Sequence, residues 1–125
     1  MGPKIGLDER LIQFAVEIIN TAEALPSTFA GNHLANQLVR SGTSPALNYA
    51  EAQGAESRSD FIHKMKIALK ELRETYCCLR IIQKKNWIEL GKLKAILDEN
   101  NQLIAIFVKS ILTAHYNNTA AKSYK

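Results

Sequence analysis

Few side chains in this sequence have the types and spacing that catalysis or metal binding requires. Asp60-x-x-His63 puts a carboxylate and an imidazole three residues apart, the spacing found in metal-binding helical bundles. Such bundles need two pairs of this kind, and neither His33 nor His115 has a carboxylate three residues before it. A solvated histidine near a helix start explains the single pair, so we predict no metal site and no cofactor.

Nucleophilic chemistry has no better support. Cys77 and Cys78 are adjacent, and neighbouring side chains on a helix point about 100° apart, which rules out an ordinary disulfide between them. The cysteines lack CxxC spacing, the chain has no glycine-rich phosphate loop, and no motif pairs a serine with a histidine. We therefore expect a protein that is not an enzyme.

A more specific surface signal comes from five cationic residues at helical spacing. Within one predicted helix they share an arc of about 80° and a length of about 27 Å. This set, called the basic ridge below, consists of Lys66, Lys70, Arg73, Arg80 and Lys84. It predicts contacts to the backbone phosphates of RNA or DNA, or to an acidic protein partner. The alternative is a solvated helix face, on which Lys70 pairs with Glu74 four residues later.

The ridge belongs to the basic half of the chain. The protein has 125 residues and a formal net charge of +4. Residues 1–56 contain three Lys or Arg against six Asp or Glu, a net charge of −3, whereas residues 57–125 contain thirteen against six, a net charge of +7. A length of 125 residues fits one domain, and no apolar run approaches the roughly 20 residues of a membrane span. We expect a cytoplasmic protein that does not bind membranes.

Four amphipathic helices must position these residues. The first, second and fourth helices are predicted over residues 8–24, 32–53 and 89–116. The third is predicted between two links, at residues 54–57 and 86–89. In the first, Leu11, Ala15 and Ile18 form an apolar stripe that Ile12, Phe14 and Ile19 widen. Short links favour antiparallel neighbours, so we predict an all-α, up-and-down antiparallel four-helix bundle over residues 1–117 and a flexible tail over residues 118–125.

Three polar or irregular positions modify this pattern. Pro45 lies inside the second helix and predicts a kink or irregular turn near Ser41 to Pro45. Ser57 followed by Asp60 resembles a capping box that opens the third helix. Asn100 interrupts the apolar seam of the fourth helix, where one asparagine can fix the register of packing at some cost in stability.

A second apolar strip on the third helix predicts an oligomer interface. Ile67, Cys78 and Ile81 lie roughly opposite its core seam, at angles that a monomeric bundle leaves exposed. Scattered apolar side chains on a monomer surface are the alternative.

Three segments resemble a known family. The segment LANQLVRSGTSPALNYAEA at residues 34–52, with DFIHK at residues 60–64 and ALKELRET at residues 68–75, is similar to the signatures of the 23S rRNA intervening-sequence proteins. The resemblance covers about residues 8–117. It implies an up-and-down bundle that assembles as a homopentamer, encoded in bacterial ribosomal RNA genes or elsewhere in bacterial genomes, without established enzymatic activity. Related accessory proteins of retroelements bind nucleic acid and a reverse transcriptase, and a protein-interaction scaffold is the alternative function.

The charged and amide side chains of these segments predict a structural polar network. Arg40, Asn48 and Glu51 lie on related faces of the second helix, and Glu71 and Glu74 of the third helix can supply carboxylates to Arg40. The alternative is that Arg40 and Glu51 present a partner site between subunits.

Overall fold

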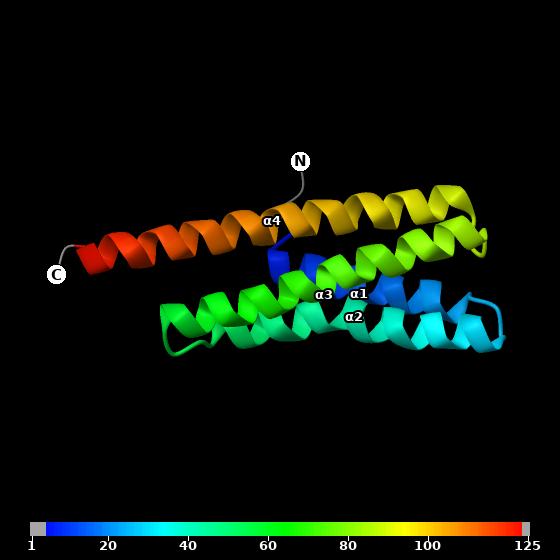
Figure 1. Cartoon of the computed structure of the whole chain (residues 1–125), viewed down its shortest axis with the longest axis horizontal. Coiled ribbons are helices and arrows are strands. Elements are labelled where there is room, and N and C mark those ends of the chain that lie inside the picture. Colours follow the sequence, from blue (N-terminus) through cyan, green and yellow to red (C-terminus); the bar gives the residue numbers. More distant parts are fainter. Residues whose placement is uncertain (1–4, 124–125) are drawn as a thin grey trace.

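The computed structural model describes residues 5–123, with side chains described through Asn117. Within that range the elements are α1 (Leu7–Glu23), α2 (Phe29–Gln53), α3 (Arg58–Lys85) and α4 (Leu90–Ser123). The helices alternate in direction and lie side by side along one long axis (Figure 1). The predicted all-α four-helix bundle is confirmed.

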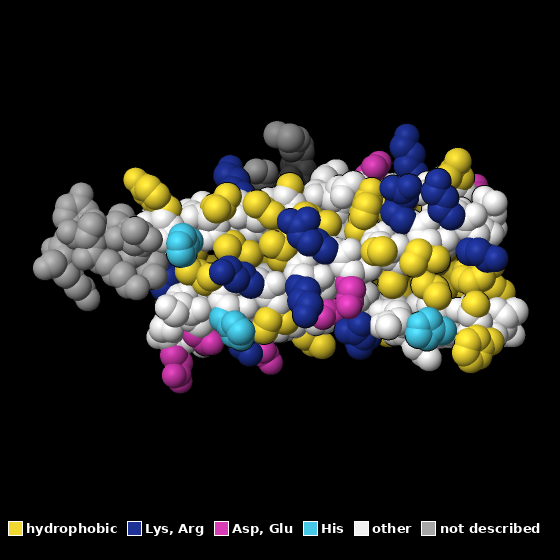
Figure 2. Space-filling model, in the orientation of Figure 1, with side chains coloured by type: hydrophobic (Ala, Val, Ile, Leu, Met, Phe, Trp, Pro, Cys, Tyr) yellow, Lys and Arg dark blue, Asp and Glu magenta, His cyan; other side chains and the backbone are white. Residues whose placement is uncertain are grey.

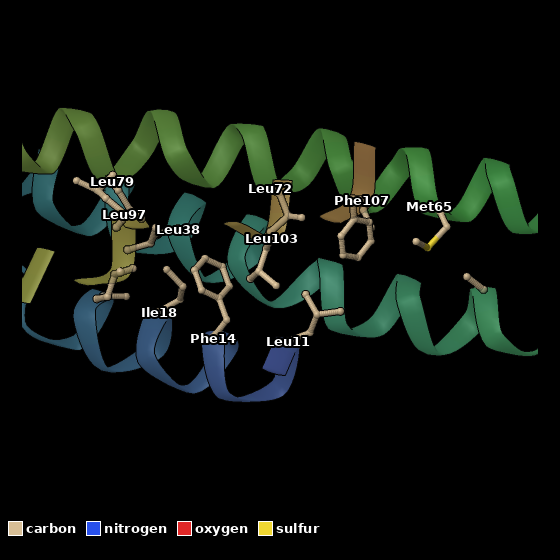
Figure 3. Close-up of a cluster of buried hydrophobic side chains, with 14 of the residues drawn as sticks. Leu11, Phe14, Ile18, Leu38, Met65, Leu72, Leu79, Leu97, Leu103 and Phe107 are labelled. Carbon is tan, nitrogen blue, oxygen red and sulfur yellow. The ribbon is translucent and has the colours of Figure 1, made fainter. Parts of the chain in front are cut away.

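The core is built from apolar residues repeated at spacings of three and four along each helix. Their side chains point from the helices into the shared interior (Figure 3). The most completely buried members are Leu11, Phe14, Ile18, Leu38, Met65, Leu72, Leu79, Leu93, Leu103 and Phe107. Each contributes about 1.5–3 kcal/mol of transfer free energy, which is why the seam fixes the positions of the surface residues beside it.

Side-chain caps set where two helices begin. The Ser57 hydroxyl accepts a hydrogen bond from the backbone N–H of Asp60 at 3.0 Å, as the sequence predicts for the start of α3. The Thr28 hydroxyl accepts from the N–H of Gly31, also at 3.0 Å. Because Thr28 is an N-cap, α2 begins at Phe29, three residues before the predicted start at Asn32.

α2 contains both a proline and a close helix contact. α2 continues through Pro45 to Gln53, so the irregular turn predicted near Ser41 to Pro45 is not formed. Its packing against α1 and α3 compensates for the one backbone hydrogen bond that Pro45 removes. A Cβ atom at Gly42 would lie 2.5 Å from Cγ2 of Ile18, so glycine lets α1 approach α2 closely.

The four helices differ in length and in how they contact one another. α2 packs extensively against α1 and α3, and α3 packs against α4, but the contact between α1 and α4 is much smaller. Arg10 of α1 bonds to Glu99 of α4 at 2.7 Å and to Gln102 at 2.7 Å across that side. α1 has 17 residues and α4 has 34, so α1 covers only part of the length of α4 (Figure 1).

The end of α4 differs from the prediction. The helix continues past Tyr116 to Ser123, because the sequence there has no glycine or proline to end it and includes alanines that favour helix. Residues 124–125 of the predicted tail lie outside the described residues. No helix in the described part of the chain combines the length and the apolar character that crossing a membrane requires.

Candidate nucleic-acid interface

The basic ridge lies on the outer surface of α3. All five of its side chains are exposed, and the apolar seam of α3 faces the core on the other side of the helix. Lys and Arg side chains are spread along the face of the molecule drawn in Figure 2, with apolar side chains between them. Ridge residues are absent from the ion pairs and side-chain hydrogen bonds found within residues 5–117.

The carboxylates expected to neutralise the ridge bind a different cation. Arg40 of α2 lies 3.3 Å from Glu71 and 3.0 Å from Glu74, and it also donates to the Gln37 side chain at 2.7 Å. The pairing of Lys70 with Glu74 along α3 is therefore not formed, since Glu74 reaches across to α2. Lys70 still lies close enough to Glu71 to exert an electrostatic effect on its carboxylate.

The environment of Glu71 favours its neutral form. Its side chain is only 14% exposed, and burial is the main reason that its pKa is raised. The negative charge of Glu74 acts in the same direction, while Arg40 acts against it. Arg40 thus holds two carboxylates together at the α2–α3 seam, with its own side chain 54% exposed.

The five residues of the predicted polar network form three separate sets. Arg40 joins Glu71 and Glu74, as described. Asn48 instead donates to the backbone carbonyl of Ser44 at 3.0 Å and to its hydroxyl at 2.8 Å, within α2. Glu51 pairs with Lys64 of α3 at 2.9 Å. Arg40 and Glu51 thus make two independent α2–α3 bridges.

Sequence patterns did not identify the buried polar contact between α2 and α3. Ser41 and Thr75 are completely buried, with their hydroxyl oxygens 3.0 Å apart. The Thr75 hydroxyl can donate its one hydrogen either to the Ser41 hydroxyl or to the carbonyl of Glu71, which lies 2.8 Å away, and the Ser41 hydroxyl lies 3.5 Å from the carbonyl of Leu38. The serine-rich composition after Arg40 was the available signal, but composition does not specify which hydroxyls meet.

Asn100 is the buried polar residue of α4. Its amide nitrogen donates to the backbone carbonyl of Leu72 at 3.1 Å, which ties α4 to α3 at one register. Its side-chain oxygen Oδ1 has no hydrogen-bond partner, although the residue is 0% exposed. Asn100 was predicted to interrupt the apolar seam of the fourth helix, and the structure places it there, buried among the seam residues of α4.

The residues of the predicted oligomer interface differ in exposure. Ile81 is 45% exposed, whereas Ile67 and Cys78 are partly buried, and Cys78 packs against the core. Burial raises the pKa of the Cys78 thiol, and Cys77 on the exposed side is also a free cysteine. Only part of this strip is therefore accessible.

A different apolar strip lies on α1. Ile12, Val16 and Ile19 are 49%, 44% and 37% exposed. The prediction that Ile12 and Ile19 widen the buried stripe is wrong, because α2 covers only one flank of α1 and no helix covers the outer flank. Periodicity identified the apolar residues but not which arc of the helix the neighbouring helices cover.

The residues considered for metal binding do not form a ligand set. Among the described residues, no group of three or more His, Cys, Asp or Glu side chains lies together in a way that could hold a metal ion. Asp60 lies in the first turn of α3, where its charge complements the positive end of the helix dipole.

Comparison with known proteins agrees with this architecture. The structure superimposes with a TM-score of 0.79 on the 1.70 Å crystal structure of a protein of unknown function from the S23 ribosomal protein family of Bacteroides thetaiotaomicron VPI-5482. The two sequences are 31% identical, and the match covers 85% of this chain and 98% of the other. A comparison with curated protein sequences finds no match. The family model of the 23S rRNA-intervening sequence protein matches residues 8–109, and the chain therefore belongs to this family.

Proposed function

We propose that the protein is a non-enzymatic homo-oligomer, a pentamer as the family resemblance implies, that binds the backbone of RNA or DNA through the basic ridge of α3. The observation that carries this proposal is the state of the ridge cations. All five are exposed and lack ion pairs within the described residues, while Glu71 and Glu74 on the same helix are bound to Arg40.

Unpaired cations are the ones that can exchange solvent for phosphate at little cost. Binding of phosphate to Lys70 or Arg73 breaks no ion pair among the described residues. The free energy gained when counterions leave the nucleic acid is therefore not reduced by the loss of such a pair. The spacing along α3 places the five charges over about 27 Å. A duplex presents one negative charge per about 1.7 Å of axis, so a ridge of this length spans many phosphate charges.

The expected binding is dependent on salt and weakly dependent on sequence. Five phosphate contacts predict a slope of log affinity against log salt of about −4.5 per ridge on duplex nucleic acid. A rise from 50 to 200 mM salt then lowers affinity about 500-fold. Contacts to phosphates alone carry no base information, so duplexes of different sequence are expected to bind with similar affinity.

A matched pair of variants tests the proposal. Lys70→Gln/Arg73→Gln removes two ridge charges, and Lys92→Gln/Lys94→Gln removes two exposed charges of α4. Fluorescence anisotropy with labelled duplex RNA, single-stranded RNA and duplex DNA over a salt series gives the affinities. The ridge variant is expected to reduce the salt slope by about 1.8, and the control to leave it near the wild-type value.

Two results would contradict the proposal. Equal losses in both variants would show that net charge and not the ridge governs binding. No binding of any of the three nucleic acids at 50 mM salt would remove nucleic acid as the ligand, and would favour an acidic protein as the partner of a scaffold.

A further inference from the structure

One flank of α4 lies uncovered because the helices differ in length. The 34 residues of α4 extend about 51 Å, against about 26 Å for the 17 residues of α1. The start of α1 lies near the middle of α4 (Figure 1), where Arg10 bonds to Glu99. Beyond this point, towards Asn117, no helix of the described residues lies against the flank of α4 that continues the α1 side.

This flank forms a groove with the start of α3. Two hollows share Arg58, Phe61 and Ala114 in their linings, and so lie next to each other. One continues along α4 past Ile106 and Lys109, and the other continues to the α2–α3 link. We call the surface lined by these five residues the distal groove. The part along α4 is mainly apolar, with the cations of Arg58 and Lys109 at its edges, whereas the part at the α2–α3 link is more polar and includes one carboxylate, Glu56.

The outer face of α1 has the complementary character. Ile12, Val16 and Ile19, four and then three residues apart, form an exposed apolar strip about 11 Å long. Asp8 and Glu23 lie exposed near its two ends, and Arg10 is turned away to α4. The face therefore presents apolar side chains with negative charge at both ends.

We infer that the outer face of α1 in one copy of the protein docks into the distal groove of the next copy. The neighbouring α1 then takes the place of the missing fourth helix beside the distal half of α4. Its carboxylates meet Arg58 and Lys109, and its apolar strip covers Phe61 and Ile106. This inference rests on the homo-oligomer of the proposed function and names the two surfaces that assemble it.

The two surfaces are different, which determines the kind of assembly. A contact between unlike surfaces is head-to-tail, so it repeats around a closed ring or along a filament and does not stop at a symmetric dimer. Lys66, Lys70, Arg73, Arg80 and Lys84 line neither hollow of the groove, so the basic ridge stays available for nucleic acid. The assembly places one ridge on every subunit.

A mixing experiment tests this pairing directly. The face variant Ile12→Asn/Val16→Asp has a disrupted α1 face and an intact groove, and the groove variant Ile106→Asp/Lys109→Glu has the reverse. Light scattering coupled to size exclusion is expected to show each variant alone as a 14.0 kDa monomer. An equimolar mixture contains one competent surface pair, so it is expected to form a heterodimer and nothing larger.

A surface control and a folding control accompany the pair. Leu47→Asp changes a side chain of α2 that is 67% exposed and belongs to neither surface, so it is expected to keep the wild-type mass. Circular dichroism of every variant is expected to match the helical content of the wild type, because the four substituted positions are exposed or half-buried.

The possible failures are distinguishable. If both variants keep the wild-type mass, or if the mixture stays monomeric, the inferred pairing is wrong while an oligomer with other contacts remains possible. If the wild type is itself a monomer, both the inference and the homo-oligomer of the proposed function are wrong. Anisotropy measurements on the ridge variant report on nucleic-acid binding independently of either result.

Discussion

Replacing Asn100 with leucine is expected to stabilise the protein. The asparagine is 0% exposed, makes one hydrogen bond to the carbonyl of Leu72, and leaves its Oδ1 without a partner. Losing that hydrogen bond costs about 1 kcal/mol, and removing an unpartnered buried oxygen recovers about 1–3 kcal/mol. The Leu72 carbonyl keeps its bond within α3, so no new unsatisfied group is created.

Packing sets the remainder of the effect. Leucine adds apolar contact in the seam, but fitting the longer side chain into space shaped for asparagine costs about 1 kcal/mol or more. The net expectation for Asn100→Leu is a gain of about 1–2 kcal/mol in the free energy of unfolding. For a chain of this size, that gain raises Tm by about 4–8 °C.

Urea denaturation at one fixed protein concentration measures the change, since oligomerisation makes stability depend on concentration. Asn100→Asp is the isosteric control. It puts a carboxylate at the same buried position and is expected to destabilise the protein by about 3 kcal/mol or more at neutral pH. A loss of stability in Asn100→Leu with an unchanged m-value would refute the reasoning, because it would show that the asparagine is worth more to the fold than its single bond.

Three further predictions follow from the packing, the caps and the titration of single residues. Gly42→Ala is expected to lower stability by about 1–3 kcal/mol in urea denaturation, because its methyl group meets Ile18, and to cost less in an Ile18→Ala background. Ser57→Ala is expected to cost about 1 kcal/mol, measured as a lower Tm, because the N–H of Asp60 loses its acceptor; an unchanged Tm would show that water caps α3 equally well. Glu71 has a raised pKa in the folded state, so its contribution to stability is fully present below the ordinary pKa of a glutamate and falls as pH rises through the raised value. The Tm difference between Glu71→Gln and the wild type is therefore expected to shift in favour of the variant between pH 4 and pH 7, and a shift in the opposite direction would contradict the assignment.

The parts of the structure that sequence predicted best depend on local chemistry. Ser57 caps the helix that its spacing to Asp60 indicates, and the residues of the α3 seam from Met65 to Ile82 are buried as their periodicity predicts. Ion pairs were harder to predict where one charged side chain had several oppositely charged residues near it in the sequence pattern. Glu74 has both Lys70 and Arg40 within possible reach, and only the packing of α2 against α3 decides for Arg40.

The solvent exposure of individual apolar side chains was the property that the sequence predicted least well. The predicted stripe of α1 combines Ile18 with Ile12 and Ile19, which lie about 120° and 100° from it on a helical wheel; Ile18 is fully buried and the other two are not. The difference arises from the number and length of the helices beside α1, which no pattern within α1 contains. The same holds for the distal groove, which exists because α1 begins halfway along α4.

The one-sided attachment of α1 also affects how the native state opens. A helix that packs extensively against a single neighbour can detach while the other three stay folded, so its amide hydrogens exchange through a local opening whose free energy lies below that of global unfolding. Native-state hydrogen exchange would then divide the protein into a slow unit of α2, α3 and α4 and a faster α1. A subunit docked on the outer face of α1 would slow that exchange, so the protection of one helix would rise with protein concentration.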